Sequence, residues 1–227
     1  VVVAFRMLPE MVWSIPKVGT FNLHASLLPD YRGAAPINWV LINGEEKTGL
    51  TTFFIDKAID TGNLLLKREV DIPFEWTAGD LHDHMMVVGS ELVLDTVKGL
   101  ENQRLKATPQ DDSLFLHHAP KIFKYDCRIH WDQHVEKVYH FVRGLSPYPA
   151  AFTTLGDQNL KIFKGSIHYG LEDATPGTLK VSQEEGNIWA ACHEGWLELK
   201  EIQLQGKKRM ATKDFLRGFR GELDQLT

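Results

Sequence analysis

Cysteine is scarce in this sequence, since Cys127 and Cys192 are the two cysteines among 227 residues. They lie far apart, so a disulfide framework is not predicted, and this fits a reducing compartment. The sequence has no run of about 18 apolar residues, so no transmembrane helix is predicted. Its first residues lack the basic segment and the cleavage site of a signal peptide. We therefore expect a cytoplasmic protein that makes no use of a membrane.

A strong excess of either charge is also missing. The formal net charge of −5 argues weakly against a protein that coats nucleic acid. The charge is unevenly spread, however. Residues 1–120 carry 10 Lys and Arg against 16 Asp and Glu, whereas residues 121–227 carry 15 against 14. The second half is therefore relatively basic.

Strands and helices alternate in the first half. The opening VVVAF is typical of a strand buried on both faces of a parallel sheet. Because such a strand needs neighbours on both sides, we expect this sequence to be the later part of a longer chain. Further strands are predicted at residues 20–24, 50–55 and 63–70, and helices at 9–15, 35–43 and 77–100. This alternation predicts an α/β architecture over residues 1–106.

The composition changes near residue 107. Residues 107–124 are polar, contain two prolines and lack a hydrophobic period, so they are predicted to be a linker. Residues 125–227 begin with a predicted helix at 135–145 and end with another at 212–218. Between them, short strands are predicted at 151–155, 160–166, 177–181, 187–191 and 196–203. Strands of this length and spacing favour a small β-barrel domain.

Three polar residues of the first half suit chemistry on a small carbonyl group. Asn22 and His24 lie two apart on one predicted strand, so their side chains share a face, and Asp60 lies in a turn that can reach the same crevice. Asn22 can donate to a developing oxyanion, His24 can donate or move a proton, and Asp60 can hold the imidazole in one tautomer. On spacing alone, a structural Asn–His pair is the commoner explanation.

Four short motifs add to this pattern: NLH at residues 22–24, SLLP at 26–29, YRGAAPI at 31–37 and IDTG at 59–62. In this order they resemble the folate-dependent formyltransferase superfamily, and SLLP with YRGAAPI most resembles its methionyl-tRNA formyltransferases. The resemblance implies transfer of a formyl group from 10-formyltetrahydrofolate to the amino group of methionyl on initiator tRNA. It also implies a partial Rossmann-like domain with Asn22, His24 and Asp60 as catalytic residues.

The resemblance further implies where the folate binds, at Arg6, Leu8, Ser26, Leu27, Leu28, Pro29 and Asp56. Arg6 is equally well explained as a cation at the end of a strand. No metal is implied. His82 and His84 form a His-x-His motif, but on a helix these side chains point about 200° apart, which disfavours a metal site.

The second half separates members of the superfamily. The motifs PKIFK, CRIHW, RGLSPYP and GKKRM resemble the linker and C-terminal domain of the tRNA formyltransferases. This implies an OB-like domain that binds tRNA through basic residues, as other OB-like domains do. The expected contacts are Arg32, Lys121, Lys124, Lys207, Lys208 and Arg209, in a protein expected to be monomeric.

Two alternatives stay open. Sugar N-formyltransferases of the same superfamily sometimes carry a similar small domain. A nucleic-acid-binding module without catalysis would make no use of Asn22, His24 and Asp60. Because the expected first strands of the sheet are absent, we also expect residues 1–227 alone to have little or no formyltransferase activity.

Overall fold

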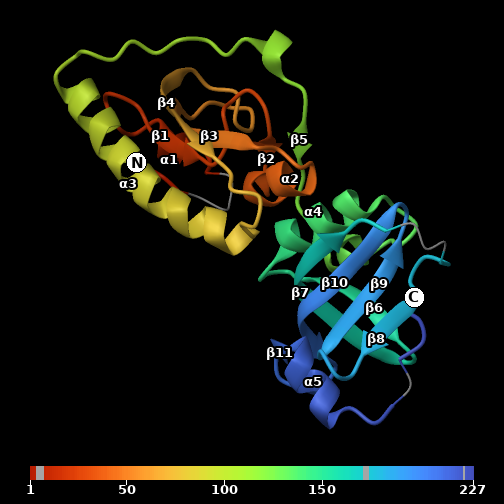
Figure 1. Ribbon diagram of the computed structural model, residues 1–227. Coiled ribbons are helices and arrows are strands. Elements are labelled where there is room, and N and C mark those ends of the chain that lie inside the picture. Colours follow the sequence, from red (N-terminus) through yellow and green to blue (C-terminus); the bar gives the residue numbers. More distant parts are fainter. Residues whose placement is uncertain (4–7, 171–173, 222) are drawn as a thin grey trace. The chain divides into compact units, whose positions relative to one another are not determined.

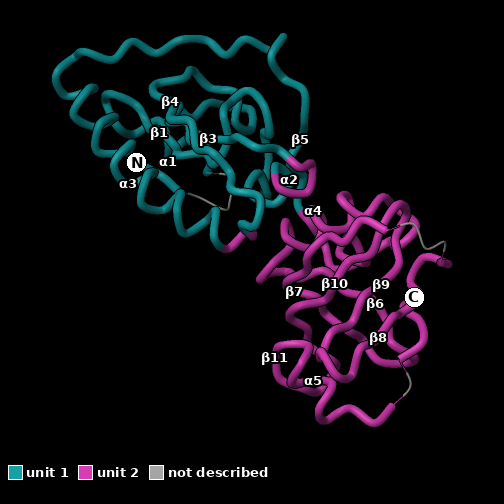
Figure 2. Tube along the Cα trace, in the orientation of Figure 1, with its two compact units in different colours: residues 1–40, 45–76, 80–121 teal, residues 41–44, 77–79, 122–227 magenta. Residues whose placement is uncertain are grey.

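The chain folds into two units, which Figure 2 shows in different colours. The computed structural model describes residues 1–3, 8–170, 174–221 and 223–227. The first unit comprises residues 1–40, 45–76 and 80–121, and the second comprises 41–44, 77–79 and 122–227. No helix in the described residues is long and apolar enough to span a membrane.

The first unit is built on a small antiparallel sheet (Figure 1). Strands β1 (Phe21–His24), β3 (Lys47–Phe54) and β4 (Leu64–Asp71) pair in the order β1-β3-β4. Both pairings are antiparallel. The prediction of a parallel sheet is therefore wrong for these strands. The strand predicted at the start of the sequence is described only at residues 1–3. Within these residues, Val2 forms a single parallel bridge with Asn22.

The helix α3 (Ala78–Glu101) packs on this sheet through its buried apolar side, which includes Leu81, Met85 and Leu92. A Cβ at Gly89 would lie 2.9 Å from Leu23 Cδ2, so a glycine allows helix and strand to approach closely here. Two shorter helices complete the first half, α1 (Glu10–Trp13) and α2 (Pro36–Ile42).

The predicted linker is largely bound to the first unit rather than free. It contains the 3-10 helix η1 (Asp112–Leu114) and the strand β5 (His118–Ala119), which pairs in parallel with β2 (Arg32–Gly33). The backbone N–H of Tyr31 donates to the carbonyl of His117 at 2.9 Å. Backbone pairing therefore fixes a segment whose composition indicated only a tether.

The second unit is a six-stranded antiparallel sheet with helices against it. Its path runs β6 (Ala151–Leu155), β7 (Gln158–His168), β10 (Gly195–Leu204), β9 (Asn187–Cys192) and β8 (Leu179–Ser182). The short strand β11 (Met210–Ala211) pairs with β10. The helical segments are η2 (Lys124–Cys127), α4 (Val135–Leu145) and α5 (Thr212–Gly218).

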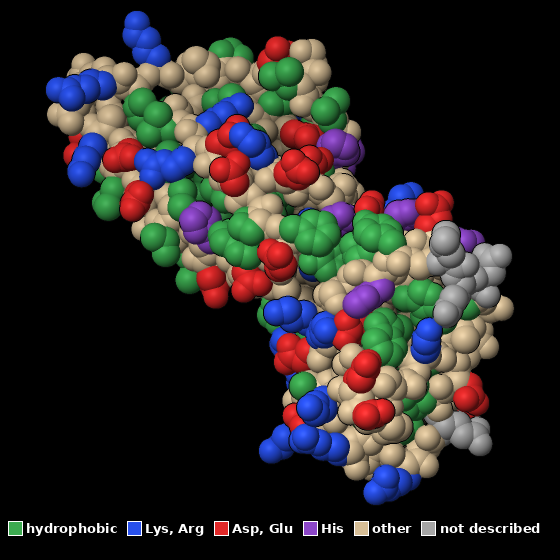
Figure 3. Space-filling view, in the orientation of Figure 1, with side chains coloured by type: hydrophobic (Ala, Val, Ile, Leu, Met, Phe, Trp, Pro, Cys, Tyr) green, Lys and Arg blue, Asp and Glu red, His purple; other side chains and the backbone are tan. Residues whose placement is uncertain are grey.

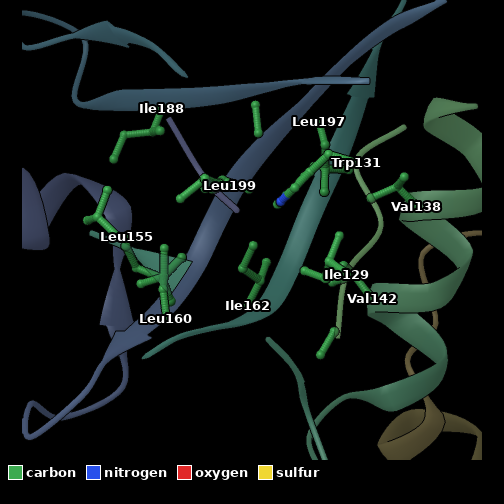
Figure 4. Packing of buried hydrophobic residues seen from close by; sticks show 14 of the residues in the cluster. Ile129, Trp131, Val138, Val142, Leu155, Leu160, Ile162, Ile188, Leu197 and Leu199 are labelled. Atoms are coloured by element: carbon green, nitrogen blue, oxygen red, sulfur yellow. The ribbon is translucent and has the colours of Figure 1, made fainter. Parts of the chain in front are cut away.

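These elements enclose one apolar core, shown in Figure 4. Val138 and Val142 of α4 face Ile129 and Leu197, and all four are nearly fully buried. The indole Nε1 of Trp131 donates to Thr153 Oγ1 at 3.0 Å, so the one polar atom of this core side chain is satisfied.

The sheet of the second unit does not form the closed barrel that was predicted. The edge strands β6 and β8 do not pair with each other in the described part of the chain. The C-terminal residues lie between them instead. Leu226 bridges to Leu155 of β6, and Gln225 bridges to Thr178 beside β8. The C-terminal residues thus bridge to β6 and to the start of β8, the two edges that would pair with each other in a closed barrel.

Candidate active site

The three predicted catalytic residues line one pocket in the first unit, which has a volume of about 590 Å³. Asn22 and His24 reach it from β1, and Asp60 reaches it from the turn between β3 and β4. The pocket lies beside β1 and the carboxyl end of β3, and Phe53 and Ile55 provide part of its apolar wall. A pocket of this size with few polar groups is typical of a small-molecule site.

His24 is held in one orientation. The residue is 7% exposed, and its Nε2 lies 2.9 Å from the carbonyl oxygen of Tyr31. Because a carbonyl can only accept, Nε2 is the donor and carries a proton. The other ring nitrogen, Nδ1, lies 3.7 Å from Asp60 Oδ2. Nδ1 is therefore the ring atom at which a proton can be gained or lost.

Asp60 is fixed from the opposite side. Its Oδ2 accepts a hydrogen bond from the backbone N–H of Gly33 at 3.0 Å. Gly33 has φ +131°, and a Cβ there would lie 2.3 Å from the carbonyl oxygen of Ala119, so the position requires glycine. Asp60 itself has φ 56°, a left-handed conformation that is uncommon outside glycine. The carboxylate thus lies between a backbone donor and the imidazole.

The predicted folate residues separate into two groups. Leu8 and Asp56 line the pocket. The Asp56 carboxylate accepts from Ala58 N at 3.0 Å and from Thr61 Oγ1 at 2.8 Å, which shapes the turn that carries Asp60. Arg6 lies outside the described residues.

Ser26, Leu27, Leu28 and Pro29 are not among the residues that line the pocket. Ser26 and Leu28 are fully buried. Thr51 Oγ1 donates to the carbonyl of Ser26 at 2.6 Å and accepts from the backbone N–H of Leu28 at 3.1 Å. These hydrogen bonds therefore support the loop that follows His24.

The predicted tRNA contacts also differ from one another. Lys121 lines the pocket, whereas Lys124, Lys207 and Lys208 are exposed on the second unit. Figure 3 shows Lys and Arg side chains gathered over the part of that unit that holds β11 and α5. Arg209 forms a two-point ion pair with Glu201 at 2.7 Å and lies 4.2 Å from the ring centroid of Phe163.

Arg32 is engaged inside the first unit. Its Nη2 donates to Gln110 Oε1 at 2.6 Å and to Asp112 Oδ1 at 2.7 Å. Sequence reasoning missed Gln110, because it assigned the segment to a linker. It also missed the carbonyl of Tyr31, because a backbone group leaves no signal in the residue type.

Comparison with known families agrees with this geometry. Residues 1–97 match the family described as formyl transferase, and residues 121–220 match the formyl transferase C-terminal domain. The methionyl-tRNA formyltransferase of Bacteroides thetaiotaomicron is 47% identical over 97% of this chain and 70% of its own length. The chain belongs to the methionyl-tRNA formyltransferase family. The Flavobacterium johnsoniae relative of the same name is also 47% identical, over 96% of this chain and 70% of its own.

Solved structures show the same fold at lower identity. HypX from Aquifex aeolicus in complex with tetrahydrofolic acid has a TM-score of 0.72 at 19% identity, covering 98% of this chain and 40% of its own. The methionyl-tRNA formyltransferase from Clostridium thermocellum has a TM-score of 0.58 at 20% identity, covering 88% of this chain and 73% of its own. In the described residues of the chain itself, no group of three or more His, Cys, Asp or Glu side chains could hold a metal ion.

Proposed function

We propose that this protein transfers a formyl group from 10-formyltetrahydrofolate to the α-amino group of methionyl-tRNA. The observation that carries the proposal is the convergence of Asn22, His24 and Asp60 on one pocket. It occurs in a chain 47% identical to a protein named methionyl-tRNA formyltransferase. The name of that relative indicates the acceptor, and the pocket contains groups suited to acyl transfer.

In the proposed reaction, the amine nitrogen attacks the formyl carbon and the carbonyl oxygen becomes an oxyanion. The amide N–H of Asn22 donates to this oxyanion, and His24 Nδ1 donates when it is protonated. The oxyanion then becomes a carbonyl again as the bond from the formyl carbon to the folate nitrogen breaks, and the new C–N bond remains in the product. A proton leaves the attacking amine and a proton reaches the folate nitrogen, so the step balances without a covalent enzyme intermediate.

The His24–Asp60 pair is suited to this proton movement. Because Nε2 is committed to the Tyr31 carbonyl, a second proton on the ring can lie only on Nδ1, beside Asp60 Oδ2. The carboxylate stabilises that proton while it is held, and the 3.7 Å separation leaves the pair able to release it.

The pocket also suits the folate as a substrate. Its volume of about 590 Å³ lies within the usual range for small-molecule sites. Leu8 and Phe53 provide apolar wall, and we propose that Asp56 and residues 57–59, which also line the pocket, contact the pterin ring. Arg6 and residues 26–29 stay predictions as folate contacts.

The second unit is the proposed tRNA-binding part. We assign residues 1–106 to the C-terminal part of a formyltransferase catalytic domain, 107–124 to a linker and 125–227 to an OB-like C-terminal tRNA-binding domain. The exposed side chains of Lys124, Lys207 and Lys208 support phosphate contacts. Arg209 and Arg32 are already paired with carboxylates, so any phosphate would compete with Glu201 or Asp112.

The test is an acceptor comparison with the natural full-length protein and 10-formyltetrahydrofolate as donor. Methionyl initiator tRNA and a nucleotide-linked amino sugar are offered separately, and formylated product is measured. We expect formylation of the tRNA and none of the sugar. Formylation of the sugar alone would assign a sugar N-formyltransferase instead, and no product from either acceptor would contradict formyl transfer.

A further inference from the structure

Gln110 connects the segment that follows α3 to the turn that carries Asp60. Its side-chain Nε2 donates to the carbonyl oxygen of Asp60 at 2.8 Å and to that of Gly62 at 2.9 Å. Both donor hydrogens of the amide are therefore used on one turn. The residue is partly buried, and the two partners lie 50 and 48 positions away along the chain.

Arg32 fixes the direction of this amide. The guanidinium donates to Gln110 Oε1 from Nη2 at 2.6 Å and from Nε at 3.2 Å. It is held in turn by Asp112 at 2.7 Å and lies 5.4 Å from the ring centroid of Phe115. Because a guanidinium can only donate, the oxygen of the amide must face Arg32 and the NH₂ group must face the turn.

The turn needs such support because its backbone is unusual. Asp60 has φ 56°, a left-handed conformation that is unfavourable for a non-glycine residue. A Cβ at Gly62 would lie 1.7 Å from the carbonyl oxygen of Phe54, so the turn is also packed closely against β3. Two hydrogen bonds from Gln110 hold the carbonyls on either side of Thr61 in this arrangement.

We propose that Gln110 is a positioning residue for the reaction, which acts through the backbone of Asp60 on the distance between Asp60 Oδ2 and His24 Nδ1. This inference rests on the proposed catalytic role of Asp60. Among the described residues, Gln110 forms no hydrogen bond with Asn22 or His24, so its effect on the reaction would pass through the turn. A shift of about 1 Å at a reacting group can reduce the rate by up to about 100-fold.

The experiment uses Gln110→Glu in the natural full-length enzyme. The carboxylate of the variant can still accept from Arg32, so the contact between positions 110 and 32 is kept. The carboxylate cannot donate, so both hydrogen bonds to the turn are lost. The matched control is Asp112→Asn, which alters the other partner of Arg32 and leaves the bonds to Asp60 and Gly62. We expect kcat to fall about 10- to 100-fold in Gln110→Glu with KM for both substrates changed by less than about threefold. Asp112→Asn should stay within about twofold of the parent.

A double-mutant cycle with Asp60→Asn separates positioning from a general structural effect. If Gln110 acts through Asp60, then Gln110→Glu should cost less than about twofold in the Asp60→Asn background. A full loss in that background, or parental kcat in the single variant, would overturn the proposal. Parental activity in Asp60→Asn alone would remove the catalytic role on which both proposals rest, and this outcome is visible without any Gln110 variant.

Discussion

The two units differ in the balance of apolar and polar side chains that they bury, although the second unit also buries the polar residues Arg143, Ser146, Thr153, Glu198 and Thr212. The second unit encloses a continuous apolar cluster to which α4 and the strands of its sheet contribute. The first unit buries, besides its apolar residues, a set of polar side chains around β1 and β3, namely Thr20, His24, Ser26, Thr48, Thr51, Thr52 and Thr96. A core of apolar side chains maximises stability, whereas buried polar groups fix particular atoms at particular places.

Because of this difference, substitutions in the two units should affect stability and turnover to different extents. In the first unit, the loop that follows His24 is fixed by side chain to backbone hydrogen bonds, such as those of Thr51. In the second unit, most buried side chains need only apolar neighbours. We therefore expect changes around the pocket to reduce turnover more than stability, and changes in the second core to do the reverse.

The largest expected effect is on turnover, from Asp60→Asn. Asparagine keeps an oxygen for the N–H of Gly33 but lacks the negative charge that would stabilise a proton on His24 Nδ1. We expect kcat to fall by about 10²- to 10⁴-fold, with the unfolding midpoint in urea close to that of the parent. Asp71→Asn, at the exposed end of β4, is the matched control and should keep the parental kcat, because the Asp71 side chain is 83% exposed and does not line the pocket. A comparable loss in this control would contradict the role assigned to Asp60.

The largest expected effect on stability is in the second unit, from Leu199→Ala. Leu199 is 1% exposed in the centre of the core (Figure 4), so truncation leaves a cavity. We expect the free energy of unfolding to fall by about 2 to 5 kcal/mol, measured by urea denaturation. Leu94, which is 57% exposed on α3, is the control, and Leu94→Ala should change stability by less than about 0.5 kcal/mol. Equal effects would contradict the packing described.

A smaller effect is expected from Thr51→Val. Both hydrogen bonds of the Thr51 hydroxyl are buried, so the variant leaves the carbonyl of Ser26 and the N–H of Leu28 unsatisfied. We expect a loss of about 1 to 3 kcal/mol in unfolding free energy, together with reduced turnover. The matched control is Thr48→Val on the same strand, since Thr48 Oγ1 is buried with no hydrogen-bond partner among the described residues. That variant should be neutral or stabilising.

A last prediction is a pH dependence of stability in the second unit. Burial, and then the nearby Arg143 guanidinium, lower the pKa of His140 from 6.5 to about 4. Arg143 Nε donates to His140 Nδ1 at 2.9 Å, which requires an unprotonated ring nitrogen. The unfolded state binds more protons between these two pKa values, so stability is full above about pH 6.5 and falls as the pH is lowered toward about 4.

Urea denaturation at several pH values measures this dependence. In His140→Gln, the amide oxygen can still accept from Arg143 but cannot titrate. We expect a shallower decline in stability between pH 6.5 and 4 than in the parent. Parallel curves for the two proteins would contradict the assignment to His140.

Much of the second unit was predictable from the sequence, and the first unit was less so. The helix at Val135–Leu145 and the strand at Ala151–Leu155 have the predicted bounds, because periodic apolar residues mark which face is buried. The barrel closure was wrong, since the position of the C-terminal residues beside β6 depends on tertiary contacts. The antiparallel order of β1, β3 and β4 was also missed, because a buried strand reads the same in either direction.

The candidate site was also predictable only in part from the sequence. The two-residue spacing of Asn22 and His24 predicted a shared face, and both residues line the pocket. The tautomer of His24 depends on the carbonyl of Tyr31, and the support of Asp60 depends on Gln110, 50 residues away. Neither contact leaves a pattern in the residue types, because one uses a backbone atom and the other lies in a polar segment without a period.

The central claim is that the pocket of the first unit performs formyl transfer through His24, and His24→Ala in the natural full-length enzyme tests it most directly. Initial rates of formylation of methionyl initiator tRNA and the urea unfolding midpoint are measured on the same preparations. We expect a rate at least about 100-fold below that of the parent, with the cooperative unfolding transition retained. A folded variant that formylates the tRNA at the parental rate would contradict it.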